Sequence, residues 1–344
     1  MTRKRKWLLG VGLTVVGILA AAGAWAGMNA TELKTSYAAR QFLSAPTDAE
    51  RAQTADRLVA LGEPGLQRLL GFVHSDDASR RNAATAALDR YLSGLPDGDP
   101  RAVNLGGQLL DNFPTCDASG QHAILELLPA VLKKTGSVHA AKCRAAVATG
   151  LKMPEPATRV FTTRLAMHPD VQMRGELLPL LAAPEADVRR AALFAVAAAE
   201  GDLLIGDEDL FRYLHDPDEG VRKVCRDALV GRDRSETEIS LGRRLSDPDP
   251  VERLKLLLDL RYDDDVADPE PWLERLSRDP EPAVRAGAAR VAIEVFTERQ
   301  LTCPVWIGRV TDEDPDATVR RVASYFRRQA VGRVDPGVRP VGAP

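Results

Sequence analysis

A short motif that recurs in the second half of the 344-residue chain restricts its fold more than any other feature. Each copy begins with an Asp-Pro or Ala-Pro pair and continues to a Val that is usually followed by Arg. The valines stand about 30 to 35 residues apart, which is the length of one two-helix repeat. Five copies align, at residues 183–192, 216–222, 247–253, 279–285 and 314–320, and a weaker copy lies at 75–80.

Each motif has the composition of a helix start. In the second copy, Asp216 can accept a backbone N–H as the N-cap, and Pro217 suits the first helical position, which needs no N–H donor. Glu219 completes the spacing of a capping box with Asp216. Apolar residues recur at helical spacing from Val221 onward, so we expect a helix with one apolar stripe. A shorter helix with large apolar residues precedes most copies.

These residues resemble the HEAT and HEAT-like repeat family, in which an Asp-Pro turn precedes a second helix that carries Val-Arg. The resemblance is specific over residues 183–330 and looser over 48–182. It implies an all-α fold: an α-solenoid in which antiparallel helix pairs form a right-handed superhelix. It also implies that Arg189 and its equivalents link neighbouring units to the turn Asp. Glu252 departs from this pattern, and the copy that contains it has its Arg displaced, so a break in the stacking is expected over residues 247–268.

Helix pairs continue upstream of the well-formed copies. Gly65–Val73 is expected to pair with Ser79–Leu92, Arg101–Asn112 with Ser119–Lys134, His139–Leu151 with Ala157–Met167, and Val171–Leu181 with the helix that starts at Glu185. Residues 29–47 are predicted to be a linker in which Ser36–Leu43 can be helical, and the Pro- and Gly-rich residues 331–344 are predicted to be a disordered tail.

The first 28 residues are predicted to be a targeting segment. Arg and Lys occupy residues 3–6, and the run that follows, residues 7–28, is uncharged and long enough to cross a hydrocarbon core of about 30 Å. A retained anchor through residues 7–27 and a cleaved signal peptide both fit, because Ala24-Trp25-Ala26 has the pattern of a cleavage site. The positive flank predicts a body outside the cytoplasm: anchored to the cell membrane by a single span, or periplasmic or secreted after cleavage.

The charge of the chain argues against a nucleic-acid partner. The formal net charge is −3, although four cations are gathered in residues 3–6, so the body is acidic. Basic residues do recur on the second helices and could line a charged groove. Acidic neighbours interrupt them, however, and the aromatic residues that would stack on bases are missing. The basic residues concerned are Arg189, Arg190, Arg222, Lys223, Arg226, Arg285, Arg290, Arg320 and Arg321.

Residue patterns typical of a metal or phosphate site are missing from the sequence. His74, His168 and His215 each follow a predicted helix, where a donor or cation is favourable, and no metal-binding spacing joins them to His122 or His139. The run 263–265 consists of three Asp residues without the spacing of a calcium loop, so we expect a solvated loop there. The pair at 106–107, Gly-Gly, lacks the Lys-Ser or Lys-Thr of a phosphate-binding loop.

The four cysteines form no CxxC pair. Cys225 lies on an apolar stripe, where a thiol acts as a small hydrophobic group. Cys116 and Cys143 lie in or near neighbouring predicted helices, so they could pair in an oxidising compartment or remain free, and the sequence leaves both possibilities open. Cys303 belongs to neither group.

These observations predict a scaffold, exported or membrane-anchored, that binds another protein through its repeats. We expect no catalytic activity, no cofactor, no metal, no nucleic acid and no small-molecule substrate. The alternatives are a HEAT-like enzyme or enzyme subunit of the lyase type, and a purely structural protein of the cell envelope. Neither the partner nor the binding face is indicated by the sequence.

Overall fold

The computed structural model describes residues 30–333, apart from residues 198–202, 263–265, 267 and 300. Contacts divide the chain into two compact units: unit 1 ends at Ala195 and unit 2 begins at Val196. The described residues form α-helices and three short 3-10 helices and contain no strand, which confirms the predicted all-α fold. The predicted N-terminal hydrophobic helix lies outside the described residues. Among the helices that are described, none is both long and apolar enough to span a membrane.

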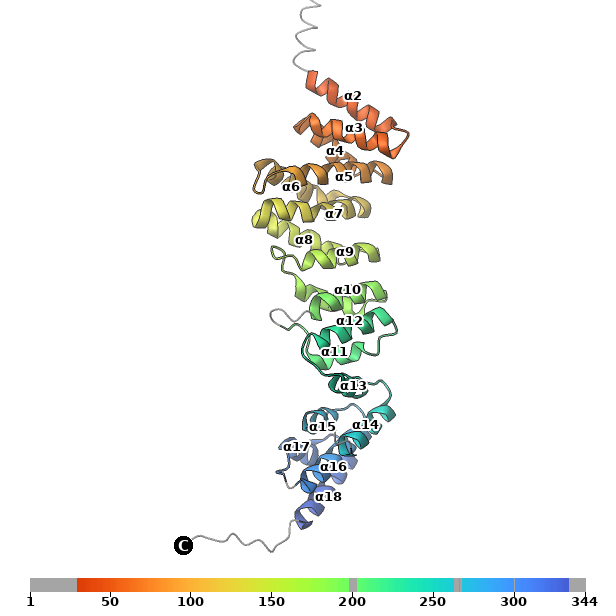
Figure 1. Ribbon diagram of the computed structural model, residues 1–344, viewed down its shortest axis with the longest axis vertical. Helices are drawn as coiled ribbons and strands as arrows, with labels where there is room; N and C mark the ends of the chain where they lie inside the picture. The colour runs from red at the N-terminus through yellow and green to blue at the C-terminus, as the bar shows by residue number, and fades with distance from the viewer. Residues whose placement is uncertain (1–29, 198–202, 263–265, 267, 300, 334–344) are drawn as a thin grey trace, which may run out of the picture. The chain divides into compact units, whose positions relative to one another are not determined.

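Unit 1 is a series of helices in which each packs on the next and, in several cases, also on the one after that. For example, α3 contacts both α4 and α5, and α7 contacts both α8 and α9 (Figure 1). The three helix pairs predicted between residues 65 and 167 are present. The helices are α2 (Ala30–Ser44), α3 (Asp48–Ala60), α4 (Glu63–Val73), α5 (Ala78–Gly94), α6 (Pro100–Asn112), α7 (Ala118–Thr135), α8 (Ala140–Gly150), α9 (Pro156–Ala166) and α10 (Ala186–Ala197), with 3-10 helices η1 (Phe113–Thr115), η2 (Gly136–His139) and η3 (Arg174–Ala182).

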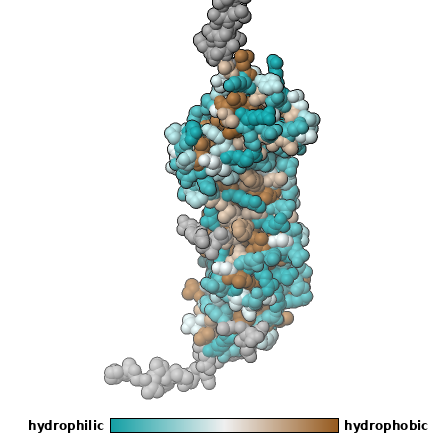
Figure 2. All heavy atoms as spheres, turned by 45° about the horizontal axis from the view of Figure 1, so that its top comes forward, coloured by the Kyte–Doolittle hydropathy of each residue, from teal (hydrophilic) through white to brown (hydrophobic). Residues whose placement is uncertain are grey.

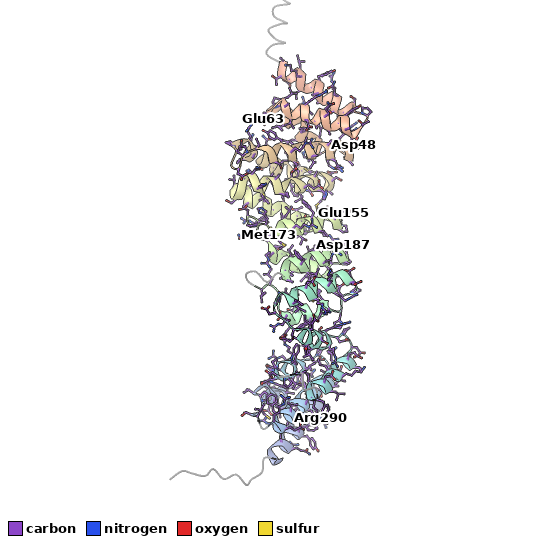
Figure 3. The ribbon with its side chains drawn as sticks, in the orientation of Figure 1. Asp48, Glu63, Glu155, Met173, Asp187 and Arg290 are labelled. Atoms are coloured by element: carbon purple, nitrogen blue, oxygen red, sulfur yellow. The ribbon has the colours of Figure 1, made fainter. Side chains whose placement is uncertain are left out.

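Helices α3 and α4 of unit 1 begin at opposite edges of the stack. Asp48, Glu155 and Asp187 stand at the starts of α3, α9 and α10, and Figure 3 shows all three along the same edge. Glu63, where α4 starts, lies at the other edge in the same view. The turns that precede α3, α9 and α10 therefore share one edge of unit 1, as expected of antiparallel pairs.

The structure differs from the sequence-based expectation at residues 29–47. This segment was predicted to be a linker in which only Ser36–Leu43 could be helical, but α2 is longer, occupies most of the segment and packs on both α3 and α4. Phe42 is fully buried, and its ring stacks on that of Phe72 with the centroids 4.6 Å apart. Helix α2 is thus the first packed layer of unit 1 rather than a connection to it.

The segment 171–181 also differs from the prediction. It was expected to be an α-helix, but the chain forms η3, a 3-10 helix with Pro179 inside it. Proline has no N–H for the α-helical hydrogen bond and clashes with the preceding turn, so a tighter, irregular turn is favoured. Arg174 ties η3 to the end of α10 by donating from Nε and Nη2 to the Ala195 carbonyl, at 3.3 and 3.2 Å.

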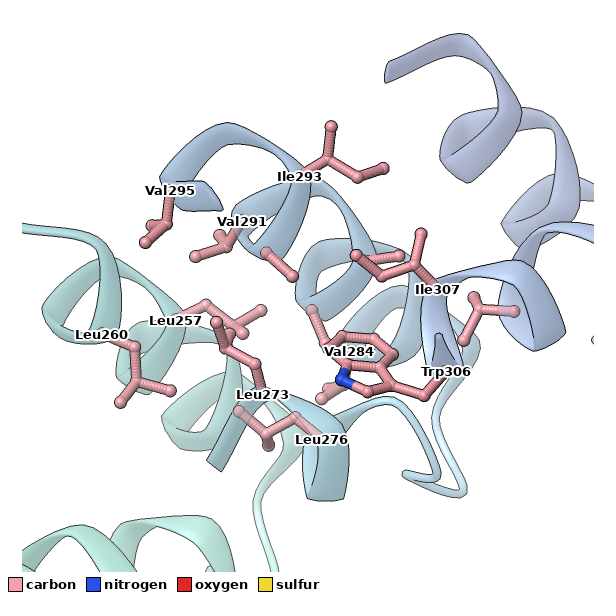
Figure 4. Packing of buried hydrophobic residues seen from close by; sticks show 14 of the residues in the cluster. Leu257, Leu260, Leu273, Leu276, Val284, Val291, Ile293, Val295, Trp306 and Ile307 are labelled. Carbon is pink, nitrogen blue, oxygen red and sulfur yellow. The ribbon is translucent and has the colours of Figure 1, made fainter. Parts of the chain in front are cut away.

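Unit 2 continues the alternation of short first helices and longer second helices. The second helices α14 and α16 pack on each other, as do α16 and α18. Leucines of α14 and α15 lie on one side of Val284 of α16, and Trp306 of α17 lies beside it in the same core (Figure 4). The helices are α11 (Asp207–Tyr213), α12 (Glu219–Val230), α13 (Glu236–Leu245), α14 (Pro250–Tyr262), α15 (Glu270–Leu276), α16 (Pro282–Glu298), α17 (Trp306–Glu313) and α18 (Ala317–Arg333).

The C-terminal boundary also differs slightly from the prediction. Helix α18 continues to Arg333, so the first residues of the segment predicted as a disordered tail are helical. The remainder, residues 334–344, lies outside the described residues.

The helix starts are built differently from the predicted capping box. Asp218, not Asp216, caps α12, because its Oδ1 accepts the backbone N–H of Val221 at 2.9 Å. Asp216 stabilises the turn one step earlier by accepting the N–H of Asp218 at 2.9 Å. Pro217 therefore lies in the turn, outside the helix. The same turn hydrogen bond is made by Asp247, Asp279 and Asp314.

Candidate functional site

An arginine near the start of each second helix in unit 2 fastens the preceding turn. Nη1 of Arg222 donates to the carbonyl oxygens of Asp216 and Pro217, at 2.8 and 2.9 Å. Arg253, Arg285 and Arg320 make the same pair of bonds to the turns before α14, α16 and α18. In unit 1, Arg51, Arg81 and Arg189 donate to the carbonyl oxygen six residues earlier, whereas α7 carries Gln121 near this place, hydrogen-bonded to Phe113.

In unit 2, Arg253 and Arg285 also bind the turn aspartate of the next unit. Nε and Nη2 of Arg253 donate to both carboxylate oxygens of Asp279, at 2.7 and 2.9 Å, and Arg285 binds Asp314 likewise at 2.8 and 3.0 Å. These four side chains are at most 11% exposed. Such forked pairs are geometrically specific, and the two of them form what we call the arginine ladder. The link to the turn Asp implied by the resemblance is therefore present at these two steps.

The predicted break near Glu252 lies elsewhere. Arg253 is not displaced, since it makes every bond that Arg285 makes. Val251 is the displaced residue: it falls one position early in the motif and is 52% exposed, whereas Val221 and Val284 are fully buried. Because this copy is one residue shorter before its valine, α14 lacks the buried valine of the other copies but keeps the arginine of the ladder.

The step of the arginine ladder that is missing lies one unit earlier, between α12 and α14, and we call this place the open ladder position. Among the described residues, Nε and Nη2 of Arg222 have no acceptor, although the same atoms of Arg253 bind Asp279. Asp247, the aspartate at the corresponding turn, faces His215, with Oδ2 4.0 Å from Nδ1. Helices α12 and α14 share only marginal contact, unlike α14 and α16 or α16 and α18.

This opening borders a groove of about 550 Å³ between α12 and α13, which we call the α12–α13 groove. Its apolar part consists of Leu214 and Ile239, which are 6% and 5% exposed. The other lining residues are Glu219, Arg222, Lys223, Arg226, Glu236, Ser240 and Arg243. Four of these are cationic and two are anionic, so the groove is positive in a chain whose net charge is −3.

The charges in the groove are only partly paired. Arg226 donates from Nη2 to the Glu236 carboxylate, so this pair is neutral overall. Lys223 and Arg243 are exposed, and no carboxylate among the described residues pairs with either. The groove therefore presents unpaired cations above a small apolar floor, a combination suited to an anionic group with an apolar neighbour.

A second cavity of unit 2, of about 490 Å³, lies among α11, α13 and the region of α15. Phe211 and Trp272 supply its aromatic wall, with ring centroids 6.1 Å apart. Its charges are already engaged with one another: Asp207 accepts from Arg232 and Arg234, which together hold its pKa below the ordinary value against the opposing effect of burial. This cavity can take an apolar side chain but offers no unpaired cation comparable to those of the α12–α13 groove.

A cavity of about 660 Å³ in unit 1 is lined by His122 and other residues of α7 and α9. Nδ1 of His122 lies 2.8 Å from Oγ1 of Thr158 on α9, and Nε2 lies 3.3 Å from Glu126, one turn later on α7. The hydrogen bond to Glu126 raises the pKa of His122, and partial burial opposes the rise. The four-residue spacing between His122 and Glu126 on one helix is a sequence signal for this pair, distinct from the metal-binding spacings.

The other histidines have structural contacts. His74 and His215 follow α4 and α11, near the predicted places, and His168 follows α9. Nε2 of His215 donates to the Arg243 carbonyl at 2.6 Å, and Nδ1 of His168 accepts the N–H of Asp170. Within the described ranges, no three His, Cys, Asp or Glu side chains are grouped closely enough to hold a metal ion. The three Asp residues at 263–265 lie outside those ranges.

All four cysteines are free thiols. Cys116 contacts Nδ1 of His74 at 3.1 Å rather than Cys143, which is fully buried. Burial raises the pKa of the Cys116 thiol to about 11, so its histidine neighbour does not generate a thiolate near neutral pH. Cys225 is buried on the apolar stripe of α12, as predicted, and burial raises its pKa to about 12.

The glycine pair at 106–107 lies within α6 and serves packing. A Cβ on Gly106 would stand 2.8 Å from Cγ1 of Val131 on α7, so the close approach of α6 and α7 requires glycine there.

No family model matches the chain, and no curated protein does either. Among solved structures, an archaeal HEAT-like repeats protein from Thermococcus onnurineus NA1 is 18% identical, with 75% of this chain and 95% of that chain covered and a TM-score of 0.36. An engineered protein is 16% identical, with 87% and 99% covered and a TM-score of 0.30. The helix pairs and the repeated turns of the chain themselves show its repeat architecture.

Proposed function

We propose that this protein is a scaffold of HEAT-like repeats that binds another protein. The observation that carries the proposal is the α12–α13 groove, a preformed recess with buried apolar residues below and unpaired cations around it. Small apolar areas ringed by polar groups are typical of protein-recognition sites. A series of stacked helix pairs also supplies a long surface for such contacts, and we propose that the pairs form the right-handed superhelix of an α-solenoid.

We further propose that the first 28 residues export or anchor the scaffold. The support is the sequence alone: cations at residues 3–6, followed by the uncharged run 7–28. The body would then work outside the cytoplasm, bound to the membrane through residues 7–27 or released after cleavage. In this proposal the protein is not an enzyme and binds neither nucleic acid nor a small-molecule substrate.

Photocrosslinking in cells tests the binding function. A photoreactive amino acid placed at Ser240, which is exposed in the groove, is expected to give one discrete crosslinked protein. The matched control is the same amino acid at Arg328, an exposed position on α18, which should not give that product. Equal products from both positions, or none from Ser240, would contradict the proposal.

Fractionation of the same cells tests the export. The body is expected in the membrane fraction, accessible to protease only from the extracytoplasmic side, if residues 7–27 are retained, and in the periplasmic or secreted fraction if they are cleaved. The N-terminal sequence of the mature protein then separates an anchor from a cleaved signal. A chain found in the cytoplasm would overturn the export part of the proposal and favour the enzyme alternative.

A further inference from the structure

We infer that the α12–α13 groove binds an acidic segment of the partner protein, in which carboxylates lie next to a large apolar side chain. This inference rests on the proposed scaffold function and names the partner's chemistry. Its first support is the open ladder position at Arg222, whose Nε and Nη2 have no acceptor among the described residues.

The molecule itself shows what such a position binds. Arg253 and Arg285 fasten their turns through Nη1, as Arg222 does, and use Nε and Nη2 to hold both oxygens of a carboxylate. Arg222 is held by the same two carbonyl bonds, so its guanidinium is already oriented. A carboxylate from another chain can therefore take the place that Asp279 takes for Arg253, without a change in the turn.

Neighbouring cations extend the site along α12 and α13. Lys223 and Arg243 are exposed, line the same groove and have no ion-pair partner in the described part of the chain. Several carboxylates in one segment would complement them, and the electrostatic attraction would hasten association and fix the register. Leu214 and Ile239 form the floor, which gives the segment's apolar side chain a place to bury.

A peptide fits these features better than a nucleic acid. No aromatic residue lines the groove, so bases would find no stacking surface. Glu219 and Glu236 interrupt the cations and would repel a continuous row of phosphates, whereas a peptide can place a neutral residue beside each of them. The acidic net charge of the chain points the same way.

A binding titration on the purified full chain tests the inference. The probe is a short fluorescent peptide of Glu, Asp and Leu, and fluorescence anisotropy reports binding. Wild-type protein should bind the peptide, and added salt should weaken the affinity, because exposed charges are screened. Combining Lys223→Glu with Arg243→Glu should weaken it about tenfold or more, since two attractive contacts become repulsive.

The matched control places the same charge change outside the groove. Arg327→Glu with Arg328→Glu alters two exposed cations of α18 and should change the affinity less than about twofold. Arg222→Lys keeps the charge but removes the fork, so it should also weaken binding, and circular dichroism would show that each variant is folded. Because Lys223 and Arg243 make no described side-chain bond within the chain, their replacement should leave the fold intact.

The inference would be overturned by no binding of the peptide, by equal loss in the groove and control variants, or by tighter binding of a single-stranded polynucleotide than of the peptide. Complete displacement of the peptide by millimolar phosphate would reduce the groove to a simple anion site and also overturn it. If any of these outcomes occurred while the Ser240 crosslink persisted, the scaffold function would still be supported. Only the inference that the partner segment is acidic would be rejected.

Discussion

At the scale of single residues, the pair between Arg285 and Asp314 joins two repeats of unit 2. The Asp314 side chain is 4% exposed and the Arg285 side chain 11% exposed. Water therefore cannot reach either group to take over its hydrogen bonds unless the surrounding structure rearranges. Removal of one partner from a buried ion pair leaves the other charge uncompensated, which costs about 3–5 kcal/mol. The hydrogen bonds from Arg285 lower the pKa of Asp314 below its ordinary value.

Replacing Asp314 by Asn therefore gives a residue-scale prediction. Asn can still accept the N–H of Asp316, so the turn should remain, but the free energy of unfolding should fall by about 3 kcal/mol. Because the folded pKa of Asp314 is lowered, its contribution is complete above the unfolded value of about 4 and is lost as pH falls through the folded pKa. Urea unfolding should thus show a smaller difference between the two proteins at lower pH.

An exposed ion pair supplies the control for this measurement. Arg278 and Glu274 pair on α15 and just after it, with side chains 60% and 37% exposed. Glu274→Gln should cost less than about 1 kcal/mol, because exposed pairs contribute little. Equal losses for Asp314→Asn and Glu274→Gln would show that the ladder has no special stabilising role.

At the scale of elements, helix α4 contains two glycines whose surroundings differ completely. A Cβ on Gly65 would stand 1.8 Å from the Leu58 carbonyl oxygen of α3, an impossible contact with backbone. A Cβ on Gly71 would meet nothing within 4 Å. Gly65→Ala should therefore push α3 and α4 apart and destabilise unit 1 by about 1–3 kcal/mol, as overpacking does.

The matched substitution Gly71→Ala should be neutral or stabilising by up to about 1 kcal/mol, because alanine loses less conformational freedom in a helix. Thermal unfolding followed by circular dichroism compares the two variants directly. A stable Gly65→Ala protein with an unchanged melting temperature would mean that α3 and α4 do not approach as closely as described.

The elements also show how much of the fold could be predicted from sequence. Helical periodicity and Asp-Pro starts were sufficient to place α12, α16 and α18, because a buried stripe and a turn leave strong local signals. The register of α14 could not be obtained in this way. Counting from Val251 misplaces the motif by one residue, and only packing shows that Arg253, not Val251, occupies the buried position.

The candidate site depended on information that the sequence does not hold. Basic residues such as Lys223 and Arg226 were noted on the second helices, but a solvated, salt-bridged face was the preferred explanation for them. Whether Arg222 finds an acceptor depends on where α14 lies relative to α12, which is a property of tertiary packing. The groove is present because α12 and α14 do not pack closely, and no sequence motif marks the absence of such a contact.

At the scale of the whole molecule, the open ladder position should divide unit 2 into two regions of different stability. Repeat proteins are stabilised mainly through contacts between neighbouring units, so a weakened interface permits separate opening. The ladder joins α14 to α18 without interruption, whereas α12 has only marginal contact with α14. Native-state hydrogen exchange of the full chain should therefore show α12 opening at a lower free energy than α16.

The variant Asp314→Asn tests this division further. It should bring the exchange of α16 and α18 closer to that of α12, because it removes the ladder step that holds them, while α12 itself should change little. Exchange of α12 and α16 in a single cooperative step, with the variant lowering both equally, would contradict the division. Binding of the acidic peptide should then act in the opposite sense: a carboxylate on Arg222 supplies the missing step and should slow the exchange of α12 specifically.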